Sequence, residues 1–172
     1  MLGLYLFRHA SALRSSAHGD KDRALDASGR AAAAMMGAWL RRQEAQPERA
    51  LVSDARRTRE TFQIACAQTG MTASPRYEPS LYDADEDALL RLLAEFAGSA
   101  AVVLMIGHNP GLASLAAGLS GEGDPQALAQ MRQTFPPAAI ARLSLPVTSW
   151  RQADWGGATL DAFVTPDSLA ER

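Results

Sequence analysis

Residues 2–10 of the chain read LGLYLFRHA, an apolar and aromatic run that ends abruptly in Arg8 and His9. A run of this length, bounded by charge, is typical of a strand that is buried on both faces of a parallel sheet. The pattern recurs in AVVLMI at 101–106, which leads into GHNPG, and in RALVS at 49–53, which leads into DARRTR. Three apolar strands are therefore expected to end in histidine or arginine.

Helical patterns lie between these strands. Asp26 or Ser28 stands where a polar side chain caps the first helix, and Asp85 stands at the same place before the third. Asn109, followed by Pro110, is the expected cap of the fourth. Strands that alternate with helices imply right-handed crossovers and a largely parallel sheet. The expected helices are Ser28–Arg42, about Ala55–Thr69, Asp85–Phe96, Pro110 to about Leu119, and one opened by Asp124-Pro125. A short strand is expected at Ser74–Glu78.

The last part of the chain has a different character. Ala139–Leu145, Ser149–Trp155 and Ala158–Val164 have the composition of strands. Gly156-Gly157 is a tight hairpin signal between the last two, and Gly121–Asp124 is expected to be a turn. We therefore expect an α/β fold, a three-layer α/β/α sandwich in one domain spanning residues 1–172. Its central sheet should be mostly parallel, with a C-terminal antiparallel hairpin.

Composition narrows the class of protein. The chain has 172 residues, enough to bury a core, and a net charge of -2, which gives no reason to expect nucleic acid or an anionic membrane as partner. One cysteine excludes an internal disulfide and a cysteine-based zinc cluster. No apolar run is long enough for a membrane span or a signal peptide. We expect a cytoplasmic protein that is a monomer or a weak dimer.

The strand ends predict where a ligand binds. In a parallel sheet the carboxyl ends of the strands lie along one edge, and ligands of open α/β sheets bind beyond that edge. Arg8 and His9 follow the first strand, one of the arginines in DARRTR follows the second, and His108 follows the third. We therefore expect basic side chains from distant positions to gather in one crevice.

These residue types suit the chemistry of phosphate. The forked donors of two arginines match a tetrahedral oxyanion, and a helix that starts at Pro110 would add N–H groups. A neutral histidine can attack phosphorus, while a second one stabilises the negative charge on the oxygens. A carboxylic acid must then move protons, and Asp83 is our first candidate, with Asp85 second. The arginines supply the positive charge, so no metal or cofactor is required.

Other interpretations of the same residues remain open. Arginines at 56, 57 and 59 would usually form a solvated helix face, with only one pointing into the crevice. A metal site of His9, His108 and Asp83 is conceivable, although the sequence lacks the compact ligand spacing of such sites. A module that binds phosphate or a phosphoprotein without turnover would use the same residues.

Five segments together resemble a known family: LFRHASA at 6–12, DRALDASG at 22–29, LVSDARRTRET at 51–61, LYDAD at 81–85 and IGHNPG at 106–111. The chain resembles the histidine phosphatase, or phosphoglycerate mutase-like, superfamily. Within it the chain is most similar to the small SixA-like phosphohistidine phosphatase branch. An RHA segment, followed by S-x-x-x-R-x-x-x-T and then GHNPG, is a specific combination.

The resemblance implies a role for each matching residue. His9 corresponds to the nucleophile that becomes phosphorylated, and Arg8 to its phosphate-binding neighbour. Arg57 is the matching helix arginine because it lies four residues after the serine of the motif, and His108 matches the second histidine of the phosphate pocket. Asp83 corresponds to the acid/base carboxylate, although larger relatives usually have glutamate there.

Two further candidates for substrate binding are Ser15, in the polar loop after the first strand, and Asn109. The sequence departs from the family at Ala10, where glycine is common. The resemblance implies metal-independent hydrolysis of a phosphomonoester, or of phosphohistidine on a protein, through a phosphohistidine intermediate. The short segment at 81–85 leaves no room for the lid insertion of the mutases, so we expect an open pocket.

Overall fold

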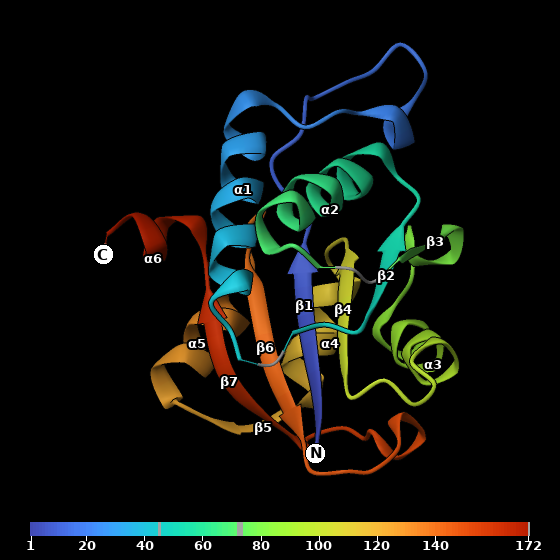
Figure 1. Cartoon of the computed structure of the whole chain (residues 1–172), viewed down its shortest axis with the longest axis vertical. Helices are drawn as coiled ribbons and strands as arrows, with labels where there is room; N and C mark the ends of the chain where they lie inside the picture. Colours follow the sequence, from blue (N-terminus) through green and yellow to red (C-terminus); the bar gives the residue numbers. More distant parts are fainter. Residues whose placement is uncertain (45, 72–73, 172) are drawn as a thin grey trace.

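A seven-stranded sheet forms the centre of the molecule (Figure 1). The structure is a computed structural model that describes residues 1–44, 46–71 and 74–171. Among its strands β6 alone runs antiparallel to both of its neighbours, so the predicted mostly parallel sheet is confirmed. In the order β3-β2-β4-β1-β6-β7-β5, the strands are β1 (Leu2–Arg8), β2 (Arg49–Ser53), β3 (Pro75–Glu78), β4 (Val102–Gly107), β5 (Ser120–Gly123), β6 (Ile140–Leu145) and β7 (Ala158–Val164).

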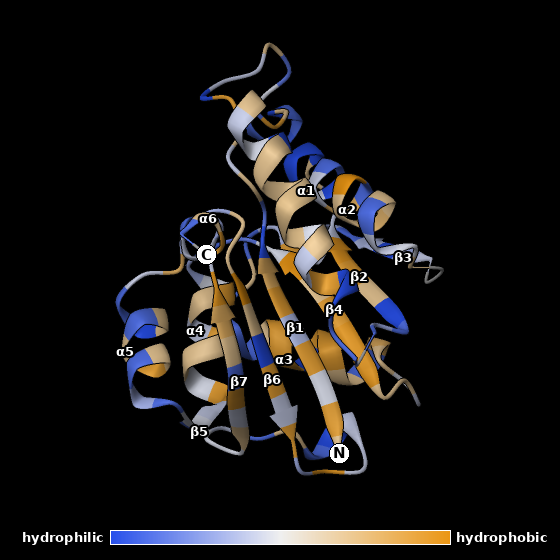
Figure 2. Cartoon of the chain, turned by 60° about the vertical axis from the view of Figure 1, so that its left-hand side comes forward, coloured by the Kyte–Doolittle hydropathy of each residue, from blue (hydrophilic) through white to orange (hydrophobic). Residues whose placement is uncertain are grey.

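Helices cover both faces of this sheet, which confirms the three-layer α/β/α sandwich (Figures 1 and 2). The first layer contains α1 (Ala27–Arg41) and α2 (Arg56–Thr69), with α6 (Pro166–Ala170) beside α1. The opposite layer contains α3 (Glu86–Phe96), α4 (Gly111–Leu119) and α5 (Pro125–Gln133). Short 3-10 helices are η1 (Asp20–Asp22), η2 (Pro79–Leu81) and η3 (Trp150–Gln152). None of the helices in the described ranges combines the length and apolar composition needed to cross a membrane.

The central strand β1 is buried on both faces, as its apolar run predicts. Leu4 and Leu6 point into the core beneath α3 and α4, whereas Tyr5 and Phe7 point into the core beneath α1 and α2. Side chains of a strand alternate between its faces, so a strand between two helical layers needs apolar residues at every position. Because β1 pairs in parallel with β4, Arg8 stands opposite Gly107 at the ends of the two strands.

Helix ends follow the predicted signals, with one exception. The Asp26 carboxylate accepts from the Gly29 amide and caps α1, and Asp85 caps α3 in the same way. Gly70 ends α2 in the left-handed conformation that glycine adopts without strain. The fourth helix differs from the prediction, because its N-cap residue is Pro110 rather than Asn109.

The C-terminal hairpin has different arms from those expected. It consists of β6 and β7, joined by residues 146–157. Residues 149–155 do not form a strand, because Ser149 and Gln152 make a capping box for η3 and the indole of Trp150 is buried, donating to the carbonyl of Ala100. Gly121–Asp124 was expected to be a turn, yet Ser120–Gly123 pairs in parallel with β7. The two glycines of β5 allow this, since a Cβ on Gly121 would lie 2.0 Å from a backbone oxygen.

Candidate active site

Four basic side chains meet beyond the carboxyl ends of β1, β2 and β4. Arg8 ends β1, His9 follows it, Arg57 lies in the first turn of α2, and His108 follows β4. The rings of the two histidines have centroids 5.2 Å apart, and an Arg57 terminal nitrogen lies 3.4 Å from Nδ1 of His108. All four line one cavity of about 410 Å³. The structure therefore brings together residues that are up to a hundred positions apart in the chain.

The hydrogen bond of His9 determines which ring nitrogen can react. Its Nδ1 lies 2.8 Å from the carbonyl oxygen of Ala10, which can only accept, so Nδ1 carries the hydrogen and Nε2 carries the lone pair. Burial, together with the charges of Arg57 and Arg8, lowers the pKa of His9 to about 4. The imidazole is therefore neutral at pH 7 and has a nucleophilic Nε2.

His108 is held in the opposite tautomer. Arg57 can only donate, so Nδ1 of His108 accepts from it, and Nε2 donates to the hydroxyl of Ser53 over 2.7 Å. Burial, followed by the nearby charges of His9 and Arg57, lowers the pKa of His108 to about 3. A bound anion would raise that pKa, because it favours the protonated ring.

Both arginines that line this cavity keep a donor without a partner among the described residues. Arg8 donates from one terminal nitrogen to the carbonyl of Phe135, and Arg57 donates to the backbone carbonyl of Asp20. The Nε atoms of both arginines are buried and have no hydrogen-bond partner among the described residues. Burial and the like charge of Arg57 lower the pKa of Arg8, although an arginine stays charged. Two guanidinium groups of like charge that line one cavity favour an anion there.

The segment that connects β4 to α4 shapes one wall of the cavity. Asn109 donates from its side-chain amide to the same carbonyl of Phe135, and its buried side-chain oxygen has no partner in the part of the chain that the structure describes. A Cβ on Gly111 would lie 2.1 Å from the carbonyl oxygen of Ala84. Glycine at the start of α4 therefore lets this helix pack against the loop that carries Asp83.

Of the predicted site residues Asp83 and Ser15, only Asp83 lines the cavity. Asp83 is exposed and lines the cavity. Asp85, the second candidate, caps α3 instead. Ser15 is exposed and is not among the residues that line this cavity, whereas Ser11 is. Of the three arginines in α2, Arg57 lines this cavity and Arg56 and Arg59 do not, which agrees with the expectation that only one points into the crevice.

Sequence reasoning missed Asp20 and Tyr82. Asp20 lies in η1, within a segment that reads as a polar surface loop, and its carboxylate lies 3.2 Å from Arg57. Tyr82 donates its hydroxyl to that carboxylate and places its ring 5.3 Å from the ring of His108. The only signal for either was the position of Tyr82 inside the LYDAD segment; nothing in the sequence marks Asp20.

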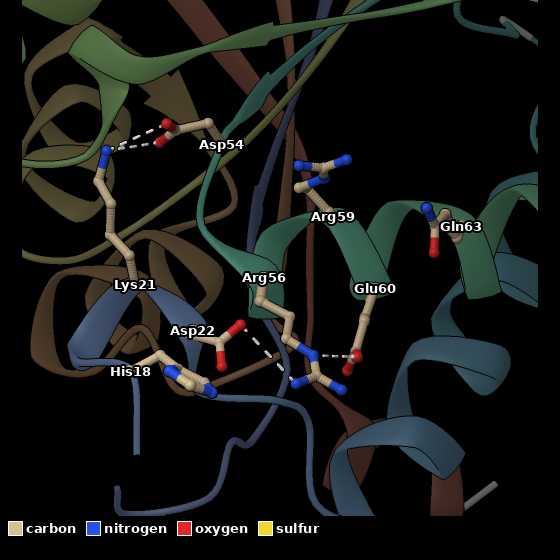
Figure 3. A pocket seen from close by; sticks show the side chains of 8 residues that line it. All are labelled: His18, Lys21, Asp22, Asp54, Arg56, Arg59, Glu60 and Gln63. Carbon is tan, nitrogen blue, oxygen red and sulfur yellow. Dashed lines mark hydrogen bonds and ion pairs between the residues drawn. The ribbon is translucent and has the colours of Figure 1, made fainter. Parts of the chain in front are cut away.

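A second cavity, of about 460 Å³, lies on the other side of η1 (Figure 3). Lys21 binds Asp54 over 2.9 Å there, and Arg56 binds Glu60 and approaches Asp22. Most of the charges in this cavity are paired with one another. It contains none of the residues to which the sequence assigns chemistry. Among the described residues, no group of three or more His, Cys, Asp and Glu side chains could hold a metal ion.

Comparison with known proteins identifies the family of the chain. The family model of the histidine phosphatase superfamily (branch 1) matches residues 4–89. The uncharacterized protein ML1117 of Mycobacterium leprae is 32% identical over 148 residues, 86% of this chain and 89% of that protein. The uncharacterized protein Rv1276c of Mycobacterium tuberculosis is 30% identical over 162 residues, 92% and 99% of the two chains.

Solved structures agree in fold. A structure assigned to the phosphohistidine phosphatase SixA of Nakamurella multipartitia superposes with a TM-score of 0.82 at 32% identity, covering 96% of each chain. The protein histidine phosphatase SixA in complex with tungstate superposes with a TM-score of 0.79 at 26% identity, covering 98% of this chain and 99% of that one. The chain therefore belongs to the histidine phosphatase superfamily, branch 1, and is similar to its SixA phosphohistidine phosphatases.

Proposed function

We propose that this protein is a phosphatase that hydrolyses phosphohistidine or a phosphomonoester through a phosphohistidine intermediate on His9. The observation that carries the proposal is the hydrogen bond from Nδ1 of His9 to the carbonyl of Ala10. It leaves the lone pair on Nε2, in a ring that burial keeps neutral, beside two arginines whose Nε atoms are buried. A neutral nucleophile next to an anion site is what transfer of a phosphoryl group requires.

In the first step, Nε2 of His9 attacks phosphorus, and the bond from phosphorus to the leaving group breaks. The electron pair of that bond goes to the leaving group, and Asp83, which lines the cavity, is the candidate that gives an oxygen leaving group its proton. Arg8 and Arg57 bind the oxygens of the phosphoryl group, and His108 donates to them once the nearby anion has raised its pKa. The arginines supply the positive charge for this step, so the proposal needs no metal ion.

In the second step, water attacks the phosphorus of phosphorylated His9, and Nε2 recovers its electron pair as inorganic phosphate leaves. Asp83 is the candidate that accepts the proton of this water, because it is a carboxylate on the rim of the cavity. The likeness to proteins named as phosphohistidine phosphatases supports phosphohistidine on a protein as substrate, and the tungstate complex of one of them shows a relative binding a tetrahedral oxyanion.

The test compares His9→Ala with His18→Ala, which changes an exposed histidine in the polar loop. We expect His9→Ala to abolish hydrolysis of 4-nitrophenyl phosphate, and His18→Ala to retain it, in the presence of a chelator. An acid-labile phosphoenzyme should accumulate in the unmutated protein and be absent from His9→Ala. Full activity of His9→Ala would refute the proposal. Binding of vanadate without turnover of any substrate would support a phosphate-binding module instead.

A further inference from the structure

An aspartate lies at the mouth of the active site, beside the arginine that binds phosphate. The carboxylate of Asp20 contacts a terminal nitrogen of Arg57 at 3.2 Å and Nε of Arg23 at 2.8 Å, and it accepts from the hydroxyl of Tyr82. Asp20 and Tyr82 both line the cavity of His9 and His108. A second carboxylate is thus available to any substrate that enters.

Contacts on both sides hold Asp20 in this place. On the inner side, Arg57 donates to its backbone carbonyl over 2.9 Å. On the outer side, Lys21 binds Asp54 and Arg56 approaches Asp22, which ties η1 to the start of α2 (Figure 3). Asp20 therefore faces the active site while its two neighbours in η1 face the second cavity.

Asp20 is unsuited to act as a proton donor. The hydrogen bond from Tyr82, with Arg57 and Arg23, lowers the pKa of Asp20 to about 2, so the carboxylate is ionised at neutral pH. The leaving oxygen of an alkyl phosphate needs a proton, and an ionised carboxylate cannot give one. The leaving ring of a phosphohistidine needs no added proton when its other ring nitrogen, the one not bonded to phosphorus, already carries a hydrogen. Its ring can then leave as neutral imidazole.

We infer that Asp20 makes the site selective for phosphohistidine over phosphate esters by accepting a hydrogen bond from the N–H of the leaving imidazole. In this step the P–N bond breaks, its electron pair returns to the substrate ring, and the phosphoryl group passes to Nε2 of His9. The hydrogen stays on the second ring nitrogen, and no proton changes place. Tyr82 places an aromatic ring beside the same opening, next to His108. This inference rests on the proposed function of His9.

The test compares Asp20→Asn with the matched variant Asp22→Asn, which changes a carboxylate in the same turn that faces the second cavity. We expect Asp20→Asn to lower kcat/KM for N-phosphohistidine by roughly tenfold to a hundredfold, the effect of one hydrogen bond to a charged group. For 4-nitrophenyl phosphate, kcat/KM should stay unchanged or rise, because a carboxylate no longer competes with the substrate for Arg57. Asp22→Asn should stay within about twofold on both substrates.

Parallel losses on both substrates, or an unchanged kcat/KM for N-phosphohistidine, would overturn the inference. If Asp20→Asn unfolds, Tyr82→Phe takes its place, since it removes the hydroxyl that holds the carboxylate and should shift the ratio of the two kcat/KM values in the same direction. Wild-type protein that hydrolyses the ester alone would overturn the inference and leave the proposed function standing. Wild-type protein that hydrolyses neither substrate would overturn both.

Discussion

Each residue of the S-x-x-x-R-x-x-x-T motif makes a specific contact in the site. Ser53 accepts from Nε2 of His108, Arg57 donates to Nδ1 of the same ring, and Thr61 accepts from the backbone amide of Ala10. The first two contacts fix the tautomer of His108. The contact of Thr61 holds the backbone of Ala10 in place, and the carbonyl of Ala10 in turn fixes the tautomer of His9. The spacing of the motif therefore serves both histidines, His108 by direct hydrogen bonds and His9 through the backbone of Ala10.

Replacing Arg57 with lysine should impair catalysis although the charge is kept. Arg57 is buried, and its two terminal nitrogens have different partners: one donates to the backbone carbonyl of Asp20, and the other contacts the carboxylate of Asp20 and His108. A single ammonium group cannot reproduce this forked arrangement. We expect Arg57→Lys to lower kcat/KM for 4-nitrophenyl phosphate by about a hundredfold. The neighbouring Arg56→Lys is the matched control, because its side chain is half-exposed and faces the second cavity. Equal activity of both variants would contradict a phosphate-binding role for Arg57.

Three of the residues that the sequence could identify stand directly at strand ends. Arg8, His9 and His108 each follow an apolar run, and their approach to one another is dictated by the pairing of β1 with β4. Asp20 could not be found in this way, because its position depends on how η1 folds back onto α2. That folding depends on contacts such as the one between Lys21 and Asp54, which are 33 residues apart and carry no periodic signal.

At the scale of elements, the junction between β1 and α2 carries the site. The hydroxyl of Thr61 accepts from the amide of Ala10 over 3.0 Å and donates to the carbonyl of Arg57 over 2.7 Å. It therefore links the segment after β1 to the helix turn that holds the arginine. Thr61 is fully buried, so no water can replace it there.

Thr61→Val should destabilise the protein and lower its activity. The change keeps the shape of the side chain but leaves the buried amide of Ala10 without an acceptor, which costs about 1–3 kcal/mol of unfolding free energy. We expect urea denaturation to show this loss, and kcat to fall because the carbonyl that orients His9 is less firmly held. Thr69→Val, at the last turn of the same helix, is the control and should keep wild-type kcat. A Thr61→Val protein with wild-type stability and kcat would show that the junction is not needed.

Element prediction succeeded where local signals and tertiary contacts agree. The strand Arg49–Ser53 has the predicted bounds, and Asp26 and Asp85 cap helices as expected. It failed for 149–155, because apolar and polar residues do not alternate there as they do in a strand. Burial of Trp150, whose indole donates to the carbonyl of Ala100, decides the conformation instead. It failed for β5 as well, because pairing with β7 stabilises a segment whose glycines indicate a turn.

At the scale of the whole molecule, the sheet places two neutral histidines side by side, and the stability of the fold depends on pH as a result. Their pKa values are about 4 for His9 and about 3 for His108, against an ordinary value of 6.5. Below pH 6.5 these two histidines bind protons in the unfolded chain but stay unprotonated in the native protein until the pH falls to about 4. The free energy of unfolding therefore rises with pH between about 4 and 6.5, and it falls as the solution is acidified through that window.

We expect the free energy of unfolding to fall by roughly 2 kcal/mol for each of the two histidines between pH 7 and pH 5, a range that lies above the titration of most carboxylates. Urea denaturation at pH 7, 6 and 5 measures it. His108→Gln keeps a side-chain amide near Ser53 but removes one titrating ring, so its loss over the same range should be about half that of the wild type. Saturating inorganic phosphate should also reduce the loss, because a bound anion favours protonated histidine and raises the native pKa. Stability that is constant from pH 7 to pH 5, or a His108→Gln protein with the full wild-type slope, would contradict the conclusion that burial keeps these rings neutral.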